Sequence, residues 1–344
     1  MKRNVLFTSF FCLLFISTTF LNKYILSVLK FTYPTIFQGW QTLVGIIMFK
    51  ALFSTGYVDG LLNGKDWRDW ALWLPGMMCF LISIYSGSRA LSSLPIPVYL
   101  VMQNLVLAFK ATVDLIHQKQ VTTLYSYCML MLSLLSALCV VKTDPQYDSD
   151  GYLWMCVHIA SLGAFETYTY FIKRRLKLRA MERLYCCCVY SVIVLTPASY
   201  FLGDAFDALK FPFFYFAKFY IGCLFSGILG MLLNLCAIRL HEMEKPFSDL
   251  DVNTMYSIAK IFCSIASLGY YEMKHSYSFT FFISINLICS FGYCESVCHK
   301  HQQKNFSPAF PSSVRAMDTK SGVDLSQYLK RHELQQDMIH IDIV

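Results

Sequence analysis

Charge is what this sequence has least of. Charged residues make up 15% of its 344 residues, whereas a soluble domain carries about 25%. The hydrophobic share is 56% and the aromatic share is 16%, and the mean hydropathy is +0.46. This composition excludes an ordinary soluble domain, and we interpret the chain as a protein of the lipid bilayer.

Motifs for catalysis and metal binding are missing as well. The sequence has no HExxH, GxSxG or GxxxxGK pattern, its eight histidines are scattered, and its 14 cysteines form no CxxC pair. The run Cys186–Cys188 lies in an apolar stretch, where cysteine acts as a small hydrophobic packing residue. We therefore predict neither an enzyme nor a metal or other cofactor.

Long apolar runs account for most of the chain. A transmembrane helix needs about 20 mostly apolar residues, and we place about ten such spans. The first continues past Phe20 without a cleavage site for a signal peptide, so it is interpreted as a span. The spans are Val5–Ile25, Pro34–Phe53, Trp70–Leu91, Ile96–His117, Tyr125–Val141, Tyr152–Ile172, Leu184–Leu202, Phe219–Ile238, Val252–Tyr270 and Phe279–Tyr293. The predicted fold class is an all-α polytopic membrane protein.

The distribution of basic residues predicts the orientation. In a soluble protein, the net charge of +7 would suggest a nucleic-acid partner. In a membrane protein, lysine and arginine gather in cytosolic loops, which explains the excess without nucleic acid. With the N-terminus in the cytosol, the basic cluster Lys173–Arg183 is cytosolic and the acidic loop Asp144–Asp150 is lumenal. Ten spans then place both termini in the cytosol.

The ten spans divide into two halves of five at the loop Lys142–Gly151. Aligning Val98–Gln103 with Met255–Lys260 superposes Tyr99 on Tyr256 and places Gln103 opposite Lys260. The match falls on the fourth helix of each half. Halves with an odd number of helices insert with opposite topology, and such repeats frame the central site of transporters. We therefore predict two inverted five-helix repeats.

Ionisable residues inside spans cost about 3 kcal/mol each and suggest function. Lys260 lies well inside its span with no acidic residue three or four positions away, so we predict that it lines an aqueous cavity. Lys110 and Asp114 share a helix face and are interpreted as a neutralising pair. Residues near span ends either reach the interface or serve the function; they are Lys23, Lys50 and Arg89.

The composition changes after about residue 300. The segment 301–344 has no long apolar run and contains Pro308, Pro311 and neighbouring serines, which is typical of a disordered linker. We therefore divide the chain into a ten-helix membrane domain over 1–300 and a polar, disordered cytosolic tail over 301–344.

Several motifs coincide with those of one known family. Asn22–Lys23, followed by Phe31–Pro34, fits the family's opening motif, and Pro97–Asn104 fits its fourth helix. Gly151–Tyr152 fits the start of the sixth span, and Lys260 falls at the lysine of a "GALNK" motif. On these residues, most of 1–300 resembles the nucleotide-sugar transporters of the drug/metabolite transporter superfamily.

Within that family, Lys30–Thr35 and Phe37–Gln41 are similar to the branch called transmembrane protein 241, which is related to GDP-mannose transporters. Three departures separate the chain from the GDP-mannose motifs. Cys188–Ser191 stands in place of "FYNN", Tyr256–Ala259 replaces "GALN", and Gln103 replaces a lysine. These departures disfavour GDP-mannose, and the resemblance to the transmembrane protein 241 branch implies UDP-N-acetylglucosamine as the substrate.

The resemblance implies a Golgi antiporter that exchanges a nucleotide sugar for a nucleoside monophosphate without metal or ATP. Another nucleotide sugar, the endoplasmic reticulum membrane and a homodimer are left open. A receptor or scaffold that uses its spans only as a framework is the alternative class. The predicted substrate-binding residues are Lys260, Tyr256, Ser257, Tyr99, Gln103, Asn104 and Lys23.

Overall fold

The computed structural model of the chain describes residues 2–56, 67–118, 123–173, 175–243, 252–271, 274 and 276–306. Within these ranges every regular element is a helix. The chain divides into two compact units, Met1–His299 and Lys300–Val344. Of the predicted tail, 301–306 are helical, and 307–344 lie outside the described residues.

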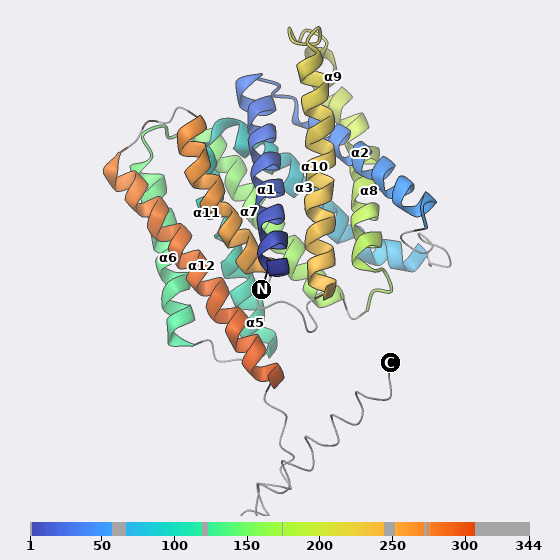
Figure 1. The fold of residues 1–344 in the computed structure, drawn as a ribbon. Coiled ribbons are helices and arrows are strands. Elements are labelled where there is room, and N and C mark those ends of the chain that lie inside the picture. The colour runs from blue at the N-terminus through green and yellow to red at the C-terminus, as the bar shows by residue number, and fades with distance from the viewer. Residues whose placement is uncertain are drawn as a thin grey trace, which may run out of the picture. The chain divides into compact units, whose positions relative to one another are not determined.

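The helices follow one another along the chain without an intervening strand in the described ranges (Figure 1). They are α1 (Lys2–Lys23), η1 (Tyr24–Val28), α2 (Pro34–Ser54), α3 (Trp67–Ser93), α4 (Ile96–Gln103), α5 (Val106–Gln118), α6 (Leu124–Thr143), α7 (Ser149–Ile172), α8 (Ala180–Phe201), α9 (Asp204–Ala208), α10 (Ala217–Met243), α11 (Val252–Tyr270) and α12 (Tyr277–Phe306).

Eight helical segments in the described ranges are long and apolar enough to cross a membrane. They confirm the prediction of an all-helical, multi-pass membrane protein. The runs predicted at Tyr152–Ile172 and Val252–Tyr270 also form helices, α7 and α11, but do not belong to the eight. Polar residues on these two helices lower their hydropathy, and the count of ten crossing helices stays a prediction.

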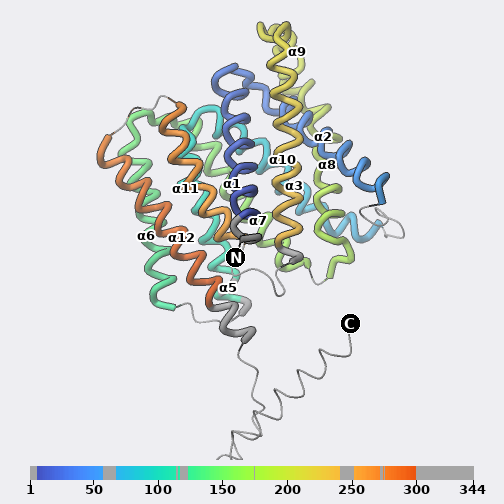
Figure 2. The backbone as a smooth tube through the Cα atoms, in the orientation of Figure 1, coloured from blue at the N-terminus to red at the C-terminus, as the bar shows by residue number. Residues whose placement is uncertain are grey.

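Helices that are distant in the sequence pack side by side. Helix α1 lies against α10 and α11, α2 lies against α8 and α10, and α3 lies against α7 and α8. Helix α7 also contacts α4 and α5. Helices α6 and α12 run along one side of the bundle (Figure 2) and are joined by hydrogen bonds from Asn286 to Ser133 and Ser136.

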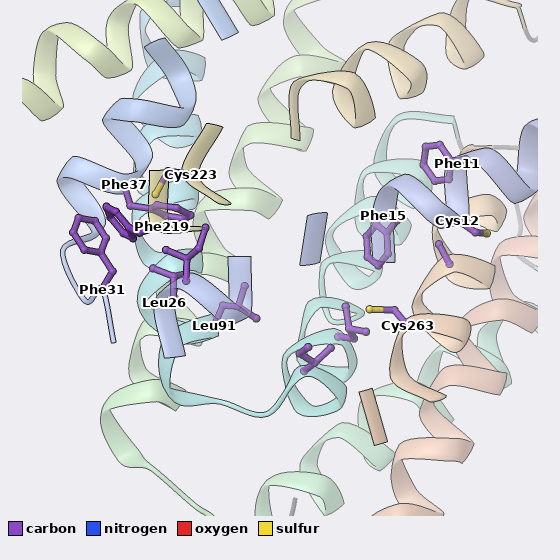
Figure 3. Close-up of a cluster of buried hydrophobic side chains, with 14 of the residues drawn as sticks. Phe11, Cys12, Phe15, Leu26, Phe31, Phe37, Leu91, Phe219, Cys223 and Cys263 are labelled. Atoms are coloured by element: carbon purple, nitrogen blue, oxygen red, sulfur yellow. The ribbon is translucent and has the colours of Figure 1, made fainter. Parts of the chain in front are cut away.

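Buried aromatic side chains pack on α1 and on the segment that follows η1. In Figure 3, the labelled side chains form two groups, one around Phe31 and Phe219 and the other around Phe11 and Phe15. In the first group, the Phe31 and Phe219 ring centroids lie 5.0 Å apart. Edge-to-face and tilted aromatic contacts of this kind contribute about 1 kcal/mol beyond burial. The first group fixes the segment after η1 against α10, and the second fixes the middle of α1 against Tyr256 of α11.

The direction of α11 relative to α1 follows from the order of their contacts. The hydroxyl of Tyr271, directly after α11, donates to the carbonyl of Phe20 at 3.0 Å. Near the start of α11, Tyr256 packs edge-on against Phe11, with ring centroids 4.9 Å apart. The end of α11 contacts the end of α1, and the start of α11 contacts an earlier part of α1, so the two helices run parallel.

The span predicted as Ile96–His117 is two helices, with a break at Asn104 and Leu105. The N–H of Asn104 donates to the carbonyl of Val101, and that of Leu105 donates to Met102, both at 3.1 Å. These bonds join residues three positions apart, the 3₁₀ spacing that is typical of a functional hinge when it interrupts a helix. The sequence contains no glycine or proline at this point, so the break was not predicted.

Candidate functional site

Lys260 meets the break in the fourth predicted span. Its Nζ donates to the Asn104 side-chain oxygen at 2.8 Å. Among the side chains that the structure describes, no carboxylate forms an ion pair with Lys260. The repeat alignment placed Gln103 opposite Lys260; the break brings the next residue, Asn104, into hydrogen-bond contact instead. An amide oxygen accepts a hydrogen bond but carries no full charge, so Asn104 does not neutralise the positive charge of Lys260.

A buried network holds the Asn104 amide in place. Its nitrogen donates to the Asn286 oxygen at 2.9 Å and lies 3.1 Å from Ser290 Oγ. Asn286 in turn donates to the Ser133 carbonyl and to Ser136 Oγ. Because both contacts of the Asn104 nitrogen go to α12, its oxygen is directed at Lys260. Fully bonded polar networks of this kind are rigid.

One face of α11 is polar along its length. The residues on it are Asn253, Ser257, Lys260, Ser264 and Ser267, and their spacing of four, three, four and three places them on one side of a helix. Ser257, Ser264 and Ser267 are buried, so this face looks into the protein. The periodicity can be read from the sequence, yet only Ser257 and Lys260 were predicted as site residues.

Tyr256 lies one turn before Lys260 and borders the polar face. Its ring packs edge-on against Phe11 and Phe15, at centroid distances of 4.9 Å and 5.9 Å. Ser257 donates to the sulfur of Cys294 at 3.4 Å. The predicted residues on α11 are thus brought together beside Asn104, with an aromatic wall supplied by α1.

Tyr99 reaches a buried histidine that the sequence analysis missed. The Tyr99 hydroxyl lies 3.3 Å from His158 Nε2, and His158 Nδ1 lies 2.9 Å from the Ser83 carbonyl. A carbonyl only accepts hydrogen bonds, so Nδ1 carries the proton and Nε2 accepts from Tyr99. The eight histidines are scattered in the sequence, and no pattern marks His158.

The space for His158 comes from a glycine on the facing helix. A Cβ atom at Gly87 would lie 2.9 Å from His158 Nδ1 and 3.3 Å from the Tyr99 hydroxyl. Only a residue without a side chain allows α7 and α3 to approach this closely. A glycine opposite a histidine is a tertiary relation, which is why no sequence pattern marked it.

Lys110 connects three helices. Its Nζ donates to Asn253 Oδ1 at 2.8 Å and lies 3.7 Å from Glu166 Oε2. The side chain of Asp114, its predicted partner, lies outside the described residues, so that pairing stays a prediction. Asn253, the partner of Lys110, lies on the same face of α11 as Lys260. The structure therefore adds Lys110, Asn253 and Glu166 to the surroundings of the predicted site.

Lys23 has a different environment. Its ammonium donates to the carbonyls of Leu91, Ser92 and Leu94, at 2.8, 3.3 and 2.9 Å. These carbonyls lie at the end of α3, where the backbone has no helical partners and the helix dipole favours a cation. The contacts give Lys23 a structural task, and its assignment to the substrate stays a prediction.

Asn22, the other half of the predicted opening motif, also joins helices. Its side-chain oxygen accepts hydrogen bonds from Gln41 at 3.0 Å and from Ser226 at 2.6 Å. Gln41 also donates to Ser226. The motif Asn22–Lys23 therefore ties α1 to α2, α10 and the end of α3. In the described ranges, no group of three His, Cys, Asp or Glu residues is placed to hold a metal ion.

Known proteins with similar sequences agree with this picture. No family model matches the chain. The UDP-N-acetylglucosamine transporter TMEM241 homolog of Xenopus laevis is 38% identical over 263 residues, which cover 76% of this chain and 87% of that protein. The chain belongs to the nucleotide-sugar transporter family. This confirms the resemblance inferred from its motifs.

Two further members of the nucleotide-sugar transporter family show how the similarity varies within it. UDP-N-acetylglucosamine transporter TMEM241 of Mus musculus is 36% identical over 236 residues, 69% of this chain and 78% of that protein. GDP-mannose transporter 2 of Neosartorya fischeri is 23% identical over 248 residues, 66% of this chain and 69% of that protein. The chain is thus more similar to these TMEM241 relatives than to this GDP-mannose transporter.

Proposed function

We propose that this protein exchanges cytosolic UDP-N-acetylglucosamine for a lumenal nucleoside monophosphate across the Golgi membrane. The observation that carries the proposal is the ammonium of Lys260, which lies on a polar helix face and is bonded to an amide oxygen. A cation inside a membrane helix is costly when the described side chains supply no carboxylate partner, and an anionic solute offsets that cost. The names of the two TMEM241 relatives favour UDP-N-acetylglucosamine as the solute.

The residue types around Lys260 suit a nucleotide sugar. Its diphosphate is anionic and faces the ammonium, while amide and hydroxyl groups satisfy the ribose and sugar hydroxyls. A lysine binds phosphate as a point charge on a flexible stem, whereas arginine holds it in a rigid, bidentate geometry. A transporter has to release its substrate, and the less rigid binding by lysine makes release of the phosphate easier. We assign the surrounding polar contacts to Tyr256, Ser257, Tyr99, Gln103 and Asn104.

Helix packing supports the inverted repeat. We pair α1 with α7, α2 with α8, α3 with α10, α4–α5 with α11, and α6 with α12. If each helix is replaced by its counterpart in the other half, the contact between α1 and α11 corresponds to the contact between α7 and α4–α5. The contact between α1 and α10 corresponds to the contact between α7 and α3. In the same way, the contact between α2 and α10 corresponds to the contact between α8 and α3, and the contact between α2 and α8 corresponds to itself. All of these contacts are present, as two related halves require.

The two aligned tyrosines follow the same exchange. Tyr256 contacts Phe11 on α1, and Tyr99 contacts His158 on α7, which is the first helix of the opposite half in each case. Phe11 and His158 lie equally far from the starts of their helices. This agreement supports a site at the interface of the halves, where alternating access requires it.

Helix directions support alternating spans. Along α11, Asn253 meets Lys110 and the later Lys260 meets the earlier Asn104, so α4–α5 runs opposite to α11. Since α1 runs parallel to α11, the first and ninth predicted spans share a direction and the fourth opposes them. The charge asymmetry of the loops then favours both termini in the cytosol. The membrane domain over 1–300 and the cytosolic tail over 301–344 belong to this proposal.

Counterflow in proteoliposomes tests the function. Vesicles loaded with UMP are expected to accumulate labelled UDP-N-acetylglucosamine, and vesicles loaded with buffer are expected not to. GDP-mannose and other nucleotide sugars are supplied in parallel, because the more distant relatives are named GDP-mannose transporters. No uptake of any nucleotide sugar would refute the transporter and favour the receptor or scaffold. Imaging of the tagged chain in cells separates the Golgi from the endoplasmic reticulum.

A further inference from the structure

A second lysine bonds to the same polar face of α11 that carries Lys260. Lys110 lies on α5, and Lys260 lies on α11 seven residues after Asn253, the partner of Lys110. Seven residues correspond to a rise of about 10 Å along a helix, so both lysines lie along about two turns of α11, a length that a bound nucleotide sugar can span. Like charges held together are unfavourable, so the pair requires negative charge nearby.

Glu166 supplies that negative charge only loosely. Its carboxylate lies 3.7 Å from the Lys110 ammonium, beyond the 2.7–2.9 Å of a charge-assisted hydrogen bond. The side chains of Lys110 and Glu166 remain 32% and 42% exposed. Partly exposed ion pairs contribute little to stability. A ligand with greater negative charge can therefore replace the carboxylate at Lys110.

The chemistry of the two lysines points to a ligand with two linked phosphates. A nucleoside monophosphate carries one phosphate, which a single ammonium serves, whereas a nucleotide sugar carries two. We infer that Lys110 is a second phosphate-binding residue, which contacts the diphosphate of the nucleotide sugar, and that the Glu166 carboxylate occupies this position in the ligand-free protein. The inference rests on the proposed function and adds a residue that distinguishes a diphosphate from a monophosphate.

Glu166 has a defined part in this arrangement. As an internal competitor it lowers the affinity for the diphosphate, because binding must first displace the carboxylate from Lys110. It also replaces the departing phosphate beside Lys110. Moderate affinity suits a carrier, which has to release its substrate on the far side of the membrane.

Binding to the purified full-length protein tests the inference. We would measure the affinities for UDP-N-acetylglucosamine and UMP in detergent by isothermal titration calorimetry. Lys110→Gln is expected to weaken binding of the diphosphate roughly tenfold, the effect of losing one hydrogen bond to a charged group, and to change UMP binding little. Glu166→Gln is expected to strengthen diphosphate binding. Lys218→Gln, at an exposed position at the start of α10, is the matched control.

The inference is overturned if Lys110→Gln weakens binding of both nucleotides equally or of neither. If Lys110→Gln does not fold, Glu166→Gln decides, because unchanged diphosphate affinity in that variant also overturns it. The exchanged pair Lys110→Glu with Glu166→Lys retains both charges but moves the ammonium to α7; full recovery of diphosphate binding would show a structural pair instead. A wild-type protein that binds no nucleotide refutes the proposed function. Wild-type binding that is lost in Lys260→Gln and intact in Lys110→Gln refutes only the inference about Lys110.

Discussion

Lys23 and Lys260 present the same feature in two different surroundings. Each is a lysine within a helix of a membrane protein, and each ammonium has three N–H donors. All three donors of Lys23 are directed at backbone carbonyls at the end of α3. The one described hydrogen bond of Lys260 goes to a side-chain amide, which leaves donors for a ligand. A lysine inside a span therefore predicts a binding function only when its ammonium keeps N–H donors that the protein does not use.

The largest expected effect comes from removing the charge of Lys260. Lys260→Ala is expected to abolish nucleotide-sugar counterflow while the protein still folds, because the anion loses its counter-charge. Lys260→Arg is expected to impair exchange strongly, since guanidinium geometry hinders release. Expression and melting temperature are measured beside uptake, and Lys218→Ala serves as the control. Full exchange by a well-folded Lys260→Ala protein would remove Lys260 from the site.

Lys23→Met is expected to act on stability instead. The substitution strands the carbonyls of Leu91 and Leu94, and an unsatisfied buried polar group costs about 1–3 kcal/mol. We expect a lower melting temperature in detergent, with the folded fraction keeping its affinity for the nucleotide sugar. Unchanged stability together with lost binding would place Lys23 in the substrate site, as the sequence analysis predicted.

Asn104→Asp tests whether the charge of Lys260 must stay uncompensated. A carboxylate at the position of the Asn104 oxygen forms an ion pair with the ammonium 2.8 Å away. It would compete with the substrate, and we expect the apparent affinity to fall roughly tenfold. The readout is the concentration dependence of counterflow. Asn104→Ser, which adds no charge, is the matched comparison, and equal affinities for the two variants would contradict the expectation.

The two tyrosines related by the repeat are expected to give smaller, similar effects. Tyr256→Ala and Tyr99→Ala each remove a ring that borders the site, and we expect the apparent affinity to weaken a few-fold, about 1 kcal/mol for a lost neutral contact. Phenylalanine at either position separates the hydroxyl from the ring. Loss of exchange in one variant with no effect in the other would contradict the equivalence of the two halves.

No effect at all is expected from Asn305→Gln. Asn305–Phe306–Ser307 forms a glycosylation sequon, but N-glycans are added on the lumenal side, and we propose a cytosolic C-terminus. Endoglycosidase treatment of the protein from mammalian cells should not change its mass. A mass shift that Asn305→Gln abolishes would overturn the proposed orientation.

The sequence by itself determined the helices and their membrane setting. Apolar runs of about 20 residues have one stable solution in lipid, a helix that satisfies its own backbone, so hydropathy sufficed to locate most elements. It also identified Lys260 as unusual, because the absence of acidic neighbours on the same helix is a local property. Family motifs such as Asn22–Lys23 could be recognised because they too are local properties of the sequence.

The tertiary structure alone decided which polar groups meet. Contacts between helices depend on the rotation of each helix about its axis and on breaks within it, and neither is encoded in local hydropathy. The break after Gln103 directs Asn104 at Lys260, and Lys110 meets Glu166 from a helix of the other half. His158 fits only because Gly87 on the facing helix leaves room. Partners of this kind lie far apart in the chain, and packing brings them together.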